Sequence, residues 1–256
     1  MPRGTLLLGN RGPSELVLVR HGESIGNVAD RKAREAGAKR LDLDVRDADV
    51  PLSETGREQA DAVGRLMTDL GPDRLPELVI SSPYRRAEET AEHALRECGG
   101  DPNVVVDERV RERDLGRFDG LTSVGIKAQF AEEAERRTRV GKFYYVPPSG
   151  ESWCDVALRI RSLLADLREG YDGKRVWVFT HEAVIMSFRY VVESLTEKEL
   201  LDIAKSTALP NCSVTSYRAD DAGLQLVTFA DAEHVDQSAA PTTTEPSKTE
   251  RAASAR

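Results

Sequence analysis

The chain has 256 residues, of which 39% are hydrophobic and 31% are charged, and its formal net charge at pH 7 is −8. This length and composition are typical of a globular chain with a single sizeable core, and the acidic balance argues against nucleic acid as a partner. Three widely spaced cysteines, Cys98, Cys154 and Cys212, favour neither a disulfide framework nor a zinc site, so we expect reduced thiols and a cytoplasmic protein.

The N-terminal residues 1–13 contain three glycines and two prolines, and we expect them to form a flexible leader before the first strand. Their short apolar run ends at Gly9, which makes it too brief for a signal peptide. No stretch of the sequence approaches the roughly 18 apolar residues of a membrane-spanning helix, so we expect no membrane contact.

The first predicted strand is the unbroken apolar run from Leu16 to Val19. Such a run is typical of a strand buried on both faces, as in a parallel sheet with helices above and below. Arg20 and His21 follow at once, and ligands of open α/β sheets bind at the carboxyl ends of strands. Gly22 would let the backbone come close to a bound group.

Residues 27–50 form a long charged stretch, which we interpret as a helix followed by a loop over the site. Its cations either lie on a solvated face or reach the substrate, and the sequence leaves both interpretations open. A second helix is predicted from the N-cap Ser53 to the break at Gly71, because apolar residues recur between them at helical spacing.

Three further apolar runs are predicted to be strands, at residues 78–80, 104–106 and 176–179. His181 leaves the carboxyl end of the last run as His21 leaves the first, which would bring both imidazoles to one edge of the sheet. A helix after the first of these runs carries Arg85 and Arg86 near its positive end. Residues 210–229 are predicted to form an edge hairpin.

Four motifs occur in a fixed order along the chain. They are Arg20-His21-Gly22-Glu23, Arg86-Ala87-Glu88-Glu89-Thr90-Ala91, Glu112 followed by Leu115-Gly116-Arg117-Phe118-Asp119-Gly120, and Phe179-Thr180-His181. Together they resemble the histidine phosphatase superfamily from about Leu16 to Tyr217, and its broad-specificity phosphatases more than its phosphoglycerate mutases. The resemblance implies a phosphoglycerate mutase-like α/β fold, a three-layer sandwich in which helices cover both faces of a mostly parallel central sheet.

The resemblance also implies a role for each motif residue. His21 would be the nucleophile that becomes a phosphohistidine, Glu112 would donate and accept the proton, and His181 would add a further hydrogen-bond donor. The residues that would bind the phosphoryl group are Arg20, Arg86, Asn27 and Ser24, with Arg85 as a further cation in an outer shell. Planar guanidinium groups suit this task because their paired donors match phosphoryl oxygens.

Two residues depart from the pattern of this family. Glu182 follows His181 where the family usually has glycine, and a carboxylate beside a phosphate would repel it. Glu182 therefore either turns away or helps to select a substrate that bears a hydroxyl or a cation. Asp114 stands where many relatives have histidine or tyrosine, so we expect recognition of the leaving group to differ.

We place the catalytic domain at residues 14–230, with a cap insertion around residues 122–149. The aromatic residues of the cap either line a substrate pocket or pack the cap onto the domain. Residues 231–256 lack apolar periodicity, and we expect them to form a disordered tail. Arg159 lies on a predicted helix of the domain, where arginine is ordinarily a surface residue.

The expected reaction is hydrolysis of a small phosphate monoester without metal or cofactor, because cations can take the place of a metal and the histidines show no zinc-ligand spacing. A phosphoglycerate-type mutase is the alternative enzyme, with Arg136 and Arg137 as loose candidates for a substrate-binding pair. A non-catalytic phosphate-binding protein is the alternative outside enzymes. The sequence leaves open the substrate and whether the chain is a monomer or a homodimer.

Overall fold

The computed structural model describes residues 12–245, which contain one six-stranded sheet. Its strands are β1 (Glu15–Arg20), β2 (Leu78–Ser81), β3 (Asn103–Val106), β4 (Arg175–Thr180), β5 (Val214–Asp220) and β6 (Gly223–Asp231). The order across the sheet is β3-β2-β4-β1-β5-β6, and the first four strands are parallel. β5 pairs antiparallel with β1 and with β6, so the predicted mostly parallel sheet with an edge hairpin is confirmed.

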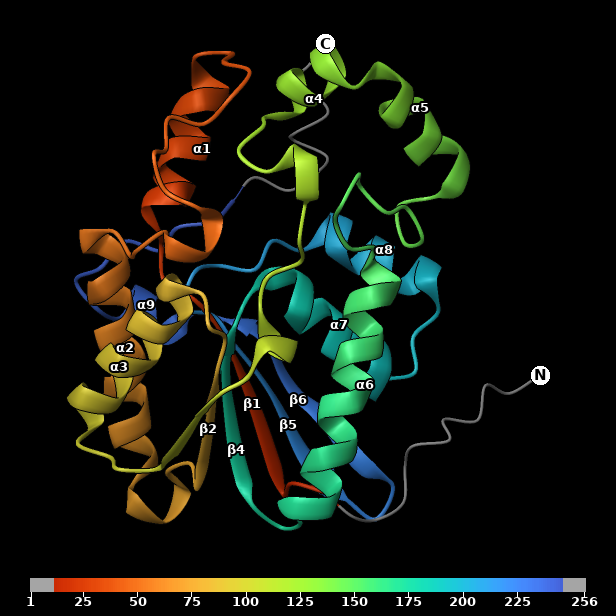
Figure 1. Cartoon of the computed structure of the whole chain (residues 1–256). Coiled ribbons are helices and arrows are strands. Elements are labelled where there is room, and N and C mark those ends of the chain that lie inside the picture. The colour runs from red at the N-terminus through yellow and green to blue at the C-terminus, as the bar shows by residue number, and fades with distance from the viewer. Residues whose placement is uncertain (1–11, 246–256) are drawn as a thin grey trace.

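Helices cover both faces of the sheet, as expected for a three-layer sandwich. They are α1 (Ile25–Glu35), α2 (Glu54–Leu70), α3 (Arg85–Cys98), α4 (Ser123–Gln129), α5 (Ala131–Val140), α6 (Trp153–Gly170), α7 (Glu182–Val192), α8 (Glu197–Ser206) and α9 (Glu233–Asp236). In Figure 1, α2, α3 and α9 lie on one side of the sheet and α6 and α7 on the other. α1, α4 and α5 lie beyond the carboxyl ends of the parallel strands.

Successive residues of β1 face two different apolar cores. Leu16 and Leu18 pack with residues of α6 and α7, whereas Val17 and Val19 pack with residues of α2 and α3. All four side chains are buried, and each contributes about 1.5–3 kcal/mol when it leaves water. Burial on both faces explains why this run contains no polar residue.

The loop after β1 packs directly on the first turn of α2. A Cβ at Gly22 would lie 2.4 Å from the Gly56 carbonyl oxygen, and a Cβ at Gly56 would lie 2.0 Å from the Glu23 carbonyl oxygen. The Ser53 amide donates to the same Glu23 carbonyl at 2.8 Å, and the Ser53 hydroxyl caps α2. The sequence suggested that Gly22 lets the backbone approach a bound group. In the structure the backbone at Gly22 closely approaches the backbone of α2.

The cap, residues 122–149, consists of α4, α5 and the loop that follows them. Phe143 belongs to the core beside α6 and α7, and its ring centroid lies 4.9 Å from that of Tyr190. The Tyr145 hydroxyl donates to Glu133 of α5 at 2.8 Å. The Tyr145 hydrogen bond lies within the cap, whereas the contacts of Phe143 favour the interpretation in which aromatic residues pack the cap onto the domain.

The chain remains ordered beyond residue 231, where the sequence predicted a disordered tail. α9 places Val235 in the core between α2 and the sheet, with no exposed surface. The side chain of Gln59 then donates to the Pro241 carbonyl at 2.7 Å. The prediction of disorder is wrong for residues 231–245, because this segment is held by buried polar partners on other elements rather than by apolar periodicity of its own.

Residues 1–11, which form most of the predicted leader, and residues 246–256 lie outside the described residues. Within the described part of the chain, no helix has both the length and the apolar character that crossing a membrane requires.

Candidate active site

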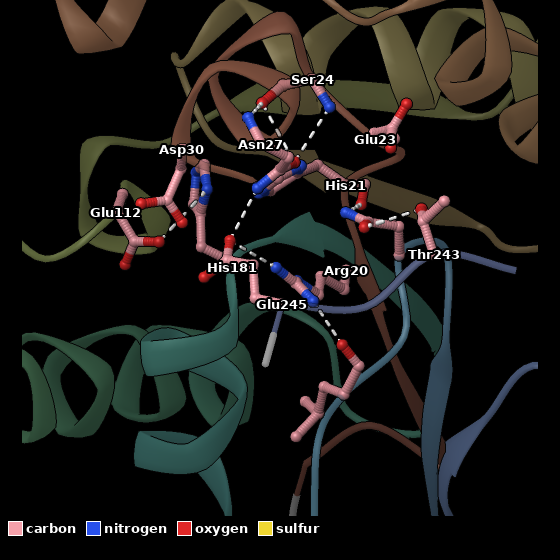
Figure 2. A network of polar contacts seen from close by, with 12 residues as sticks. Arg20, His21, Glu23, Ser24, Asn27, Asp30, Glu112, His181, Thr243 and Glu245 are labelled. Atoms are coloured by element: carbon pink, nitrogen blue, oxygen red, sulfur yellow. Dashed lines mark hydrogen bonds and ion pairs between the residues drawn. The ribbon is translucent and has the colours of Figure 1, made fainter. Parts of the chain in front are cut away.

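Three neighbouring parallel strands carry polar side chains to one edge of the sheet. β1 leads into His21, β4 into His181 and β2 into Ser82, and the sheet order makes these strands adjacent. The His21 amide donates to the Thr180 carbonyl at 2.9 Å, so the pairing of β1 with β4 continues past the strand ends. The two imidazole centroids consequently lie 5.1 Å apart (Figure 2).

His21 is a buried, neutral imidazole. Its Nδ1 lies 2.8 Å from the Gly22 carbonyl oxygen, which can only accept a hydrogen bond. Nδ1 therefore carries the ring hydrogen and Nε2 carries the lone pair. Burial, followed by the charges of Arg86 and Arg20, holds the pKa of His21 well below 6.5. At pH 7 this side chain has the protonation state that a nucleophile needs.

His181 is fully buried and presents its other ring nitrogen to the cluster. Its Nε2 lies 2.8 Å from the Ser82 hydroxyl, which accepts from the Tyr84 amide at 3.2 Å. The hydroxyl hydrogen of Ser82 is then directed at Nε2, which places the ring hydrogen of His181 on Nδ1. Among the described residues Nδ1 has no hydrogen-bond partner, and it lies 3.8 Å from Oε2 of Glu112. Burial, followed by the charge of Arg86, holds the pKa of His181 well below 6.5.

Arg20 and Arg86 are buried at the same edge, with 2% and 5% of their surfaces exposed. Arg20 donates through Nη1 to the Leu209 carbonyl and through Nη2 to Glu245 at 2.9 Å, and its Nε has no partner among residues 12–245. Arg86 donates to both carboxylate oxygens of Asp47, at 3.0 and 3.2 Å. Both cations are thus paired with carboxylates of the chain itself.

Glu112 faces His181 from the loop between β3 and α4. Its Oε1 accepts from the Arg113 amide at 2.7 Å, and its Oε2 is the atom nearest His181. Burial raises the pKa of Glu112 above 4.5, although the charge of Arg86 opposes this change. A carboxyl group with a raised pKa is suited to donate a proton.

Arg159 holds the loop that carries Glu112. Its Nη2 donates to the Glu112 carbonyl at 3.3 Å, and its Nε donates to Glu151 at 3.2 Å. Only 9% of the Arg159 side chain is exposed, so the prediction of a surface residue is wrong. Helical position alone does not show that a distant loop carbonyl requires a donor.

Ser24 and Asn27 form a capping box at the start of α1. The Ser24 hydroxyl accepts from the Asn27 amide at 3.1 Å, and the Ser24 amide donates to Oδ1 of Asn27 at 2.9 Å. This arrangement leaves the Asn27 side-chain amide free to donate to Glu245, at 2.6 Å (Figure 2). Asn27 therefore adds a donor beside Arg20, whereas the hydroxyl of Ser24 is used by the helix cap.

Two other candidates are not joined to this cluster. Arg85 donates to Glu89 at 2.7 Å on the exposed side of α3. Glu182 is the first residue of α7, and none of the hydrogen bonds or ion pairs found in residues 12–245 links its side chain to the cluster. The structure thus brings together seven of the nine predicted site residues. They are His21, His181, Glu112, Arg20, Arg86, Asn27 and Ser24.

Sequence reasoning missed Tyr84 and Asp47. The Tyr84 ring stands edge-on to His181 at 5.3 Å, and the Arg86 guanidinium carbon lies 5.0 Å from its centroid. Burial raises the pKa of Tyr84 to about 12, so the phenol is neutral. The position of Tyr84, two residues before Arg86, is a signal in the sequence that points to it. Asp47 gave none, because the charged stretch that contains it was expected to contribute cations.

The cluster combines convergent donors with one free nitrogen lone pair. The donors are the guanidinium groups of Arg20 and Arg86, Nδ1 of His181 and the side-chain amide of Asn27. Such a set is suited to bind a tetrahedral oxyanion beside the lone pair on His21. Within residues 12–245, no three side chains of His, Cys, Asp or Glu are arranged to hold a metal ion.

Comparison with known proteins gives four matches. The family model for the histidine phosphatase superfamily (branch 1) matches residues 16–232. The 2,3-bisphosphoglycerate-dependent phosphoglycerate mutase of Rhizobium meliloti (strain 1021) is 32% identical over 199 residues, which are 76% of this chain and 87% of that protein. The structure of mycobacterial glucosyl-3-phosphoglycerate phosphatase with inorganic phosphate matches with a TM-score of 0.66 at 27% identity, covering 87% of this chain and 99% of that one.

A phosphoglycerate mutase from Bacillus anthracis str. Sterne has a TM-score of 0.67 at 21% identity, covering 89% of this chain and 98% of that one. This match shows the fold. Proteins named as phosphatases and proteins named as mutases are therefore both similar to this chain.

The geometry predicts that inorganic phosphate binds at the buried guanidinium groups of Arg20 and Arg86, whose charges both act on His21. Arg86→Ala should weaken phosphate binding about tenfold to a hundredfold, because charged hydrogen bonds worth about 1.5–3 kcal/mol are lost. Isothermal titration calorimetry measures the change. Arg85→Ala is the matched control on the same helix, and its affinity should equal that of the wild type. Equal weakening by the two variants would contradict the placement of Arg86 in the site.

Proposed function

Because the chain belongs to the histidine phosphatase superfamily (branch 1), we propose that it is a metal-independent phosphatase that hydrolyses phosphate monoesters through a phosphohistidine on His21. The observation that carries this proposal is the neutral His21 ring, with its lone pair on Nε2, beside His181 and two buried guanidinium groups. A nucleophile and the charges that neutralise a phosphoryl group thus share one edge of the sheet.

Binding comes first in this mechanism. A phosphate ester resists attack because its own anionic oxygens repel a nucleophile. Arg20 and Arg86 would remove this repulsion, and His181 would donate from Nδ1 to a third oxygen. These groups are buried at the site before the substrate arrives, so little reorganisation is needed once the phosphate has replaced their carboxylate partners.

Two displacements at phosphorus follow. The lone pair on His21 Nε2 forms a bond to phosphorus as the ester P–O bond breaks, and Glu112 gives its proton to the departing alkoxide. Glu112, now a carboxylate, takes a proton from water as the water oxygen attacks phosphorus. The N–P bond breaks, which regenerates neutral His21 and protonated Glu112 and releases phosphate.

A phosphoglycerate-type mutase is the second candidate, and the identity to the Rhizobium meliloti mutase favours it. Two observations support the phosphatase instead. The stretch after Glu112 has the form Leu-Gly-x-Phe-Asp-Gly, which is closer to phosphatases. Arg136, one of the loose candidates for a substrate arginine, is paired with Glu133 and lies over the Tyr145 ring at 5.8 Å within the cap.

Turnover should depend on His21. The wild type should hydrolyse p-nitrophenyl phosphate in the presence of EDTA, and His21→Ala should lose about a thousandfold or more in kcat, because the nucleophile is removed. His93→Ala is the control, since His93 pairs with Asp61 between α2 and α3. Hydrolysis that persists in His21→Ala would contradict the mechanism, and absence of turnover in the wild type would favour a non-catalytic binder.

The same preparation separates phosphatase from mutase. Incubation with 3-phosphoglycerate and a bisphosphoglycerate primer should release inorganic phosphate without net isomerisation. Accumulation of 2-phosphoglycerate faster than phosphate would instead assign the mutase activity. A panel of sugar phosphates, nucleotides, phosphoglycerates and phosphopeptides would then identify the preferred ester.

Turnover should also depend on pH. The pKa of His21 lies well below 6.5, so its lone pair persists as the pH falls through 6.5, whereas Glu112 loses its proton as the pH rises through its raised pKa. The kcat for an alkyl phosphate should therefore be greatest on the acid side of neutrality and fall as the pH rises.

Glu112→Gln tests the alkaline limb of this profile. It should lower kcat about a hundredfold or more on an alkyl phosphate and much less on p-nitrophenyl phosphate, whose leaving group needs little protonation. Glu108→Gln, an exposed change on the same loop, is the control. Equal losses on both substrates would remove Glu112 from the role of proton donor.

A further inference from the structure

The C-terminal segment 241–245 is docked beside the candidate site by two buried amide side chains. Gln59 donates through Nε2 to the Pro241 carbonyl at 2.7 Å and to the Thr243 hydroxyl at 2.9 Å. The Asn211 backbone amide donates to the Thr243 carbonyl at 2.9 Å, and the Thr243 hydroxyl donates to Oδ1 of Asn211 at 3.0 Å. Gln59 and Asn211 are at most 1% exposed, so buried side chains of the domain hold the segment in place.

The same two side chains also hold the loop that carries the nucleophile. Oδ1 of Asn211 binds the segment, while its Nδ2 donates to the His21 carbonyl at 3.1 Å. Oε1 of Gln59 accepts from the Glu23 amide at 2.9 Å. Segment 241–245 therefore has a fixed position relative to the residues that would hold a phosphoryl group.

This position places the Glu245 carboxylate against the hydrogen-bond donors that would bind phosphate. Oε1 of Glu245 lies 2.9 Å from Nη2 of Arg20 and 2.6 Å from Nδ2 of Asn27 (Figure 2). A carboxylate oxygen between a guanidinium and an amide satisfies the same donors that a phosphoryl oxygen would use. Two anions in this position would repel each other, so phosphate and the Glu245 carboxylate exclude one another there.

We propose that Glu245 is a built-in competing ligand of the phosphate site, which the phosphate of a substrate displaces. The inference rests on the proposed function and names a partner of that same site, namely segment 241–245 of the chain itself. A tethered carboxylate has an effective concentration in about the millimolar range, so it competes with phosphate for Arg20. The pairing of Arg86 with Asp47 completes the neutralisation of both cations.

Competition by Glu245 weakens phosphate binding by a factor that depends on how often the Glu245 carboxylate leaves the site. The apparent dissociation constant equals the intrinsic one divided by the fraction of molecules in which Glu245 is released. It also favours ligands with more charge than a carboxylate. A phosphate ester carries about −1.5 to −2 at pH 7 and can displace Glu245, whereas singly charged anions compete on equal terms.

The experiment measures binding of inorganic phosphate to the full chain by isothermal titration calorimetry. Glu245→Ala should lower the dissociation constant about tenfold, since the competing charged hydrogen bonds are removed. Glu245→Gln keeps the shape without the charge and should change the affinity in the same direction. Glu233→Ala, an exposed acidic residue of α9 in the same C-terminal region, is the matched control and should bind as the wild type does.

Wild-type affinity in both Glu245 variants would overturn the inference. Because the readout is binding, it is independent of turnover. A chain that binds phosphate more tightly after Glu245→Ala but hydrolyses no ester would support the inference and contradict the proposed phosphatase. Failure of the wild type and all variants to bind phosphate would overturn both.

Discussion

Two guanidinium groups, those of Arg20 and Arg86, are buried where three parallel strands end, and the rest of the site follows from their charge. A buried cation is costly unless an anion lies beside it, and here carboxylates of Glu245 and Asp47 take that place. The same charges add to burial in lowering the pKa values of His21 and His181. One imidazole therefore keeps a lone pair, while the other donates a hydrogen without adding charge. The proposed affinity for phosphate and the neutral state of the proposed nucleophile thus have a common physical origin.

The sequence predicted those parts of the molecule that short-range patterns determine. The run Leu16–Val19 alternates between two cores, and burial on both faces leaves an apolar signature that can be recognised without a structure. Parallel pairing then brings the residues after each strand to one edge, so His21 and His181 could be expected to meet. Their separation of 5.1 Å agrees with that expectation.

The remaining features depend on contacts between segments far apart in the chain. Asp47 reaches Arg86 across 39 positions and Glu245 reaches Arg20 across 225, and no local periodicity encodes either pair. The C-terminal segment has the composition of a disordered tail, yet Gln59 supplies hydrogen-bond donors that order it. A polar segment can be fixed by partners that its own composition does not reveal.

The most direct test of the account is a crystal structure of the full chain with orthovanadate, which imitates the phosphoryl group in transfer. The account predicts vanadium bonded to Nε2 of His21, with oxygens accepting from Arg20, Arg86 and Nδ1 of His181, and with the Glu245 carboxylate displaced. Vanadate bound away from His21, or bound there while Arg20 remains paired with Glu245 and Arg86 with Asp47, would contradict it.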